Sequence, residues 1–104
     1  MNQRVLQYLK KRLPLMSDSD IEDTLKQADH VYSEEDGALG VTEIDRGFFR
    51  IVFFAADSKQ TRNKLLKEAW EAHSDVQVIV YERLKHKNKP FFHTRPYFER
   101  FLAT

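Results

Sequence analysis

Apolar residues recur at helical spacing near the start of the chain. Residues 2–13 place their leucine and valine side chains on one face, which predicts a helix that Pro14 ends. A second helix is expected after a run of alternating serine and aspartate. Ser19 and Glu22 fit a capping box at its start, and Ser17 is the rival cap.

The same spacing predicts two further helices in the second half of the chain. Asp57 and Ser58 are expected to cap one that ends near His73, and Thr94 is expected to cap a last one, with Pro96 in its first turn. The predicted buried residues are Leu65, Leu66, Ala69 and Trp70 in the first of these helices, and Tyr97, Phe98, Phe101 and Leu102 in the second.

Apolar alternation, or an unbroken apolar run, predicts four strands. They cover residues 30–32, 39–44, 48–56 and 76–82. The third is apolar at both odd and even positions except at Arg50, which is typical of a central strand covered on both faces. A strand, a helix and a strand in succession predict a parallel, right-handed crossover between the last two strands.

Turn residues separate these elements and complete the prediction of the fold. Gly37 and Gly40 are expected to supply positive φ angles around the first strand connection, and residues 45–47 a second tight turn. The order α-α-β-β-β-α-β-α predicts a single α+β domain over residues 1–104. Its mixed sheet has about four strands, with a parallel β-α-β pair in the C-terminal half.

Composition narrows the class of protein. With 41% hydrophobic and 32% charged residues, the chain is expected to fold as a globular domain. Its longest apolar stretch is too short for a membrane span, and its N-terminus lacks the apolar core of a signal peptide. The chain has no cysteine. We therefore expect a soluble cytoplasmic protein without membrane contact.

Charge is distributed unevenly along the chain. Residues 83–104 contain six Lys or Arg and one acidic residue, whereas the first 82 residues have a net negative charge. Five of the twelve Phe and Tyr residues also lie in this C-terminal part. Basic residues interleaved with aromatic residues are typical of a surface that binds a phosphate-bearing partner.

The parallel strand pair predicts where such a partner would bind. Both strands end at the same edge of the sheet, where ligands favour the crevice of open α/β sheets. The helix that starts at Ser58 would contribute its positive dipole end, and the basic loop after the last strand would form the other wall. The predicted phosphate- or nucleic-acid-binding residues are Ser58, Lys59, Arg62, Arg83, Lys85, Lys87, Lys89, Phe91, Phe92 and Arg95.

Motifs for catalysis are missing from the sequence. The four histidines have no cysteine companions and no i, i+4 pairing, and neither a nucleophile elbow nor a glycine-rich nucleotide loop is present. We expect no catalytic residue, no metal site and no cofactor. The prediction leans towards a protein that is not an enzyme.

A family resemblance covers about residues 28–101. The stretch VYSEEDGALG of residues 31–40 resembles the strand–turn–strand of the GNAT acyltransferases, and residues 49–70 resemble that family's fourth strand and following helix. The resemblance implies a related fold with CoA bound at the helix start. In the stretch that matches the pyrophosphate loop, Asn63 and Leu65 replace the family's two glycines, so side chains obstruct a bound pyrophosphate.

Three functions remain open at this point. The first is a small, non-enzymatic protein that contacts nucleic acid through its basic and aromatic loop. The second is a divergent GNAT-like protein. The third is a protein-interaction or regulatory module that docks a partner through the acidic stretch from Asp18 to Asp36, which has eight acidic residues against one lysine.

Overall fold

The computed structural model describes residues 3–81 and 91–103. Their elements follow one another as α1 (Gln3–Arg12), α2 (Asp18–Gln27), β1 (His30–Glu34), β2 (Gly37–Asp45), β3 (Phe48–Ala56), α3 (Lys59–Ala72), β4 (Val78–Tyr81), β5 (Phe91–Thr94), the single turn α4 (Arg95–Tyr97) and the π-helical turn η2 (Phe98–Leu102). The predicted single α+β domain with a mixed sheet is confirmed.

The strands lie in the sheet in their sequence order, β1-β2-β3-β4-β5. Neighbours are antiparallel except β3 and β4, which are parallel and joined through α3. The parallel β-α-β pair is therefore confirmed. The sheet has five strands rather than about four, because the residues after Phe91 extend along β4 instead of remaining in a loop.

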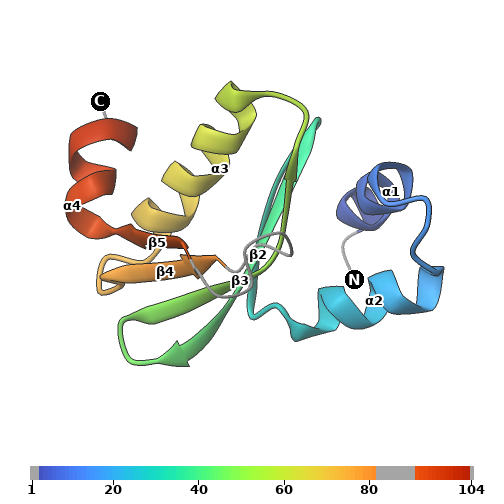
Figure 1. Ribbon diagram of the computed structural model, residues 1–104, viewed down its shortest axis with the longest axis horizontal. Helices are drawn as coiled ribbons and strands as arrows, with labels where there is room; N and C mark the ends of the chain where they lie inside the picture. Colours follow the sequence, from blue (N-terminus) through green and yellow to red (C-terminus); the bar gives the residue numbers. More distant parts are fainter. Residues whose placement is uncertain (1–2, 82–90, 104) are drawn as a thin grey trace.

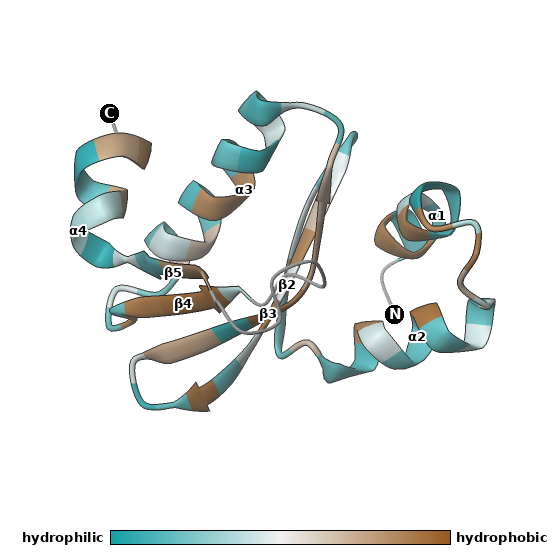
Figure 2. Cartoon of the chain, viewed as in Figure 1, coloured by the Kyte–Doolittle hydropathy of each residue, from teal (hydrophilic) through white to brown (hydrophobic). Residues whose placement is uncertain are grey.

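Helices cover both faces of the sheet (Figure 1). Helices α1 and α2 pack on one face through Val5, Leu9 and Ile21, and α3 with η2 packs on the other around Leu65 and Trp70. Figure 2 shows β4 and much of β3 as hydrophobic, and both strands contribute residues to the core under α3. No helix within residues 3–81 and 91–103 is long and apolar enough to cross a membrane.

The central strand changes the face to which its side chains point. Phe49 and Ile51 lie in the core under α3, whereas Phe53, two residues further on, lies in the core under α1 and α2. The register with β2 shifts at this place, because Gly40 pairs with Phe53 while its neighbour pairs with Ile51. The extra residue is a β-bulge, which reverses the alternation beyond it. Phe54 consequently faces α3.

Two local predictions need correction. Ser17, not Ser19, caps α2, because its Oγ accepts the N–H of Asp20 at 3.1 Å. Gly37 and Gly40 do not have positive φ angles, and among the described residues only Gly47 does, with φ 78°. Gly40 is instead needed for space, since a Cβ there would lie 2.2 Å from the ring of Phe53.

The predicted C-terminal helix is present over residues 95–102, but it is divided between α4 and η2. Pro96 lies in its first turn as expected, but Thr94 makes no side-chain capping hydrogen bond, and the backbone passes from α4 directly into η2. Phe98 and Leu102 are buried as predicted, whereas the side chains of Tyr97 and Phe101 are largely exposed. Phe98 packs in the core, where its ring stacks on the Trp70 ring with the two centroids 5.7 Å apart.

Candidate functional site

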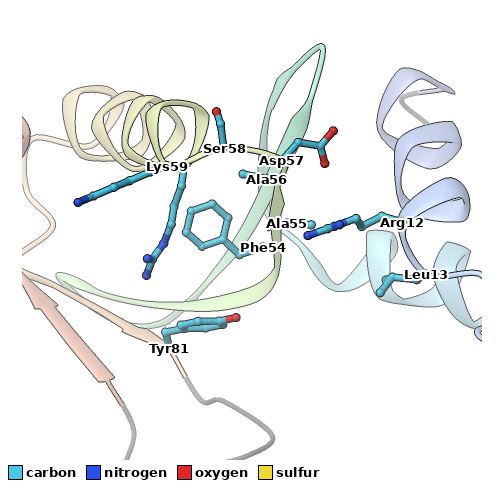
Figure 3. A pocket seen from close by; sticks show the side chains of 10 residues that line it. Arg12, Leu13, Phe54, Ala55, Ala56, Asp57, Ser58, Lys59 and Tyr81 are labelled. Atoms are coloured by element: carbon cyan, nitrogen blue, oxygen red, sulfur yellow. The ribbon is translucent and has the colours of Figure 1, made fainter.

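An open cavity of about 790 Å³ lies where β3 ends and α3 begins. Four parts of the chain line it: the end of α1, the last residues of β3 with the connection to α3, the first turn of α3, and the end of β4. The lining residues are Arg12, Leu13, Phe54, Ala55, Ala56, Asp57, Ser58, Lys59, Arg62 and Tyr81 (Figure 3). The cavity lies at the carboxyl edge of the parallel pair, as predicted from the sequence.

Three cationic side chains and two aromatic rings line this cavity. The guanidinium of Arg62 lies over the ring of Phe54, with Cζ 5.9 Å from the ring centroid. Phe54 in turn meets Tyr81 edge-on, with centroids 6.2 Å apart. Arg12 and Lys59 lie on opposite sides of the Phe54 ring (Figure 3). Lys59 and Arg62 therefore lie with the rings of Phe54 and Tyr81 on the α3 side of β3, and Arg12 lies across the strand on the α1 side (Figure 3).

Among the described lining residues, Asp57 is the one with an acidic side chain. Its Oδ1 accepts a hydrogen bond of 2.8 Å from the hydroxyl of Tyr8 on α1. Partial burial, followed by this hydrogen bond, raises the pKa of Tyr8 to about 12. Figure 3 shows the Asp57 carboxylate turned away from Phe54. The contact thus ties α1 to the start of α3 and holds the negative charge away from the rings.

The start of α3 offers backbone donors but not a free serine hydroxyl. Ser58 Oγ accepts the N–H of Thr61 at 3.1 Å and donates to Thr61 Oγ1, which itself donates to Asp36. Ser58 is therefore the helix cap, as predicted, and its predicted phosphate contact stays a prediction. The N–H groups of Lys59 and Gln60 lie in the first turn, where a helix provides no intrahelical acceptor.

Arg95 is not part of this cavity. Its guanidinium donates to the carbonyl oxygens of Val76 at 2.6 Å, His73 at 2.7 Å and Trp70 at 3.3 Å. It also lies over the Trp70 ring, 5.0 Å from the centroid. These bonds join α4 to the C-terminal end of α3 and give Arg95 a structural role, while its predicted phosphate contact stays a prediction.

The remaining predicted site residues are divided between β5 and the part of the chain that is not described. Phe91 and Phe92 are about half exposed on β5. Neither lines the cavity, although Phe91 is the register partner of Tyr81, which does. The predicted contacts of Arg83, Lys85, Lys87 and Lys89 lie outside the described residues.

Arg12, Phe54 and Tyr81 were not among the predicted site residues. Phe54 lies two residues before the end of β3, and Tyr81 is the last described residue of β4, so their place near the carboxyl edge of the parallel pair is a signal that the sequence already contained. Arg12 had no such signal, because nothing local indicates that the end of α1 packs beside the end of β3. Its place depends on the long-range packing of Val5, Leu6 and Leu9 on the sheet.

The predicted acidic face does not form a single surface. Asp29 accepts hydrogen bonds from the Thr42 hydroxyl and from the N–H of Glu43. Glu34 forms an ion pair with Lys64, with Oε1 3.2 Å from Nζ, and Asp36 accepts a hydrogen bond from the Thr61 hydroxyl. The acidic residues of α2 lie on the opposite layer of the molecule, because α2 and α3 cover different faces of the sheet. The α2 acids and the exposed Glu35 stay candidates for a docking surface.

A second polar cluster lies at the far end of α3. The Tyr32 hydroxyl is hydrogen-bonded to His73 Nε2, and the His30 ring lies 4.3 Å from the His73 ring between centroids. Burial, and then the positive potential of His30, lowers the pKa of His73. Within the described ranges no three His, Asp or Glu side chains are arranged to hold a metal ion.

Comparison of the chain with protein-family models, with curated proteins and with solved structures gives no match.

Proposed function

We propose that this protein is a non-enzymatic binding protein that holds a phosphate-bearing ligand in the cavity between β3 and α3, and that the ligand is nucleic acid. The observation that carries the proposal is the grouping of Lys59 and Arg62 with Phe54 and Tyr81 in one cavity, which Arg12 lines from the α1 side of β3. Cations with interleaved aromatic rings are what a sugar–phosphate chain with its bases requires.

The size and place of the cavity support this assignment. Its volume of about 790 Å³ falls within the usual range of small-ligand sites, roughly 300–1,000 Å³. It also opens beside the first turn of α3, whose N–H groups and dipole favour a negative charge. The basic residues Arg83, Lys85, Lys87 and Lys89 follow Tyr81 closely in the sequence and are included in the proposal as further phosphate contacts.

The test is fluorescence anisotropy with a labelled single-stranded oligonucleotide of about 12 nucleotides, repeated across a salt series. Each phosphate contact contributes about −0.7 to the slope of log K against log salt for single strands. Arg62→Gln is expected to weaken binding about 10- to 100-fold, because it removes a charge-assisted hydrogen bond of about 1.5–3 kcal/mol. It should also make the slope shallower by about 0.7.

Arg46→Gln is the matched control. Arg46 is exposed in the turn between β2 and β3 and does not line the cavity, so the same change of charge should leave the affinity almost unchanged. Absence of binding at about 50 mM salt, or a slope near zero, would refute the proposal. Equal losses in both variants would show that net charge, rather than the cavity, controls binding.

A CoA-type ligand is the second candidate. The parallel β3-α3-β4 unit with a cavity at the start of α3 is the arrangement that the resemblance to the GNAT acyltransferases implies. Against it, Asn63 and Leu65 lie inside α3, and Leu65 is completely buried, so the matching stretch is helix rather than an open pyrophosphate loop. A thermal-shift comparison of acetyl-CoA with the oligonucleotide separates the two. Stabilisation by acetyl-CoA alone would favour the second candidate.

A further inference from the structure

Helices α1 and α2 cover only part of the sheet face on which they pack. Their core contacts with the sheet lie on β1, β2 and the second half of β3, where Ala38 and Phe53 are buried. Phe48 and Arg50, in the first half of β3, point to this same face, because side chains alternate along a strand and Phe49 between them lies under α3. Both side chains are exposed.

The neighbouring strands extend this exposed area. Val78 of β4 is the register partner of Phe48, and Val80 is the register partner of both Arg50 and Phe92. Two exposed rings therefore lie on either side of β4, Phe48 with 39% and Phe92 with 55% of its surface accessible. These five residues form a surface that we call the β-face. Contiguous exposed apolar side chains of this kind are typical of a site of association.

A second exposed apolar surface lies at the other end of the molecule. The connection from α1 to α2 contains Leu13, Leu15 and Met16, and Leu15 is completely exposed. We call residues 13–23, which comprise this connection and the first half of α2, the tip. Figure 1 shows α1 and α2 at one end of the longest axis, and β4 and β5 towards the other. The tip and the β-face therefore lie apart within one copy of the chain.

The two surfaces carry opposite charges. Asp20 and Asp23 are exposed on the tip, three residues apart and therefore on one side of α2, whereas the β-face carries the cation of Arg50. Within residues 3–81 and 91–103, no ion pair involves any of these three side chains. Asp18, at the start of α2, is instead paired with Lys10, with Oδ2 3.5 Å from Nζ. The tip thus complements the β-face in charge, and both surfaces are apolar beside their charges.

We propose that the tip of one copy docks on the β-face of a second copy, so that the chain associates head to tail. Leu15 and Met16 lie against the rings of Phe48 and Phe92, and the acidic residues of α2 lie near Arg50. Two β-faces packed about a twofold axis would bring their arginines together, and two tips would bring their acidic residues together, so contact between unlike surfaces is favoured. Such a contact leaves a tip and a β-face free for further copies unless a ring closes.

The test uses Leu15→Ser, which alters only the tip, and Phe92→Ser, which alters only the β-face. Molar mass is measured by light scattering, without nucleic acid, between about 10 µM and 1 mM protein, the range in which weak contacts form. The mass of the wild type is expected to rise with concentration, and each variant is expected to stay monomeric. An equimolar mixture of the two variants should form dimers and nothing larger, because it retains one intact tip and one intact β-face per pair.

Phe101→Ser is the matched control, because it removes an exposed ring of η2 that belongs to neither surface, and it should associate as the wild type does. Phe48→Ser is a second β-face variant, and circular dichroism shows which variants are folded before they are mixed. A wild type that stays monomeric, or a mixture that forms no dimer, would overturn the inference. So would a folded Leu15→Ser or β-face variant that still associates by itself, since the contact would then join like surfaces. Because nucleic acid is absent, such a failure leaves the proposed function standing.

Discussion

A substitution of Arg95 tests whether this basic residue stabilises the fold rather than binding the ligand. The change is Arg95→Ala. It removes two short bonds, to the carbonyls of Val76 and His73, and one longer bond to the carbonyl of Trp70. These carbonyls belong to the last turn of α3 and the segment after it, where a cation is favoured by the helix dipole.

The expected loss can be worked out from these contacts. Two charge-assisted hydrogen bonds contribute roughly 1.5–3 kcal/mol each. The position of the guanidinium over Trp70 adds about 0.5–1 kcal/mol. Release of the arginine side chain recovers about 1.5–2 kcal/mol of conformational entropy. The net destabilisation is about 1.5–5.5 kcal/mol, which lowers the melting temperature by roughly 6–44 °C in a domain of this size.

The assay is urea unfolding followed by circular dichroism, beside oligonucleotide binding under conditions where every variant is folded. Arg95→Lys should lie between wild type and Arg95→Ala, because an ammonium cannot bridge separate carbonyls as a guanidinium does. Arg100→Ala, an exposed arginine in η2, is the control and should change stability by less than about 0.5 kcal/mol. A loss below about 0.5 kcal/mol for Arg95→Ala, combined with weakened oligonucleotide binding, would refute the structural role.

Three further predictions concern stability. The pKa of Tyr8 is raised and its phenol donates to Asp57, so the wild-type protein should lose stability as the pH rises from about 10 to about 12 and the phenol ionises. Tyr8→Phe should lack this loss, and urea midpoints measured at pH 9 and above would show it. Because the pKa of His73 is lowered in the folded protein, its neutral ring should contribute to the free energy of unfolding above about pH 6.5, and this contribution should decline as the pH falls below that value. A His73→Gln variant whose stability depends on pH as the wild type's does would contradict this. Gly40→Ala should destabilise by about 1–3 kcal/mol, because its Cβ meets the Phe53 ring, and Phe53→Leu in the same chain should restore part of the loss; equal stability of Gly40→Ala and wild type would refute the close contact.

Local pattern was sufficient to predict much of this fold. The bounds of β3 follow from an apolar run between two turns, and Ser58 was recognised as a cap because it precedes a helical stripe. The parallel pair, and with it the place of the cavity, followed from chain connectivity. These features depend on residues that are close together in the sequence, so local physical rules describe them well.

The features that sequence reasoning missed depend on contacts between distant residues. Phe91 and Phe92 became a strand because β4 offers them an edge, not because of any alternation of their own. Arg95 is indistinguishable in the sequence from a solvated arginine, yet its donors are bound by carbonyls about twenty residues away. The bulge in β3, which turns Phe54 towards α3, depends on the close approach of Gly40 and the Phe53 ring.

The most direct test of the account is a titration of the ¹⁵N-labelled protein with the single-stranded oligonucleotide, followed by amide chemical shifts. The account predicts that the largest shifts fall on Phe54, Ala56, Lys59, Arg62 and Tyr81 around the cavity. Shifts confined to the exposed face of β5 around Phe92, with none at the cavity, would contradict it. So would a spectrum that the oligonucleotide leaves unchanged.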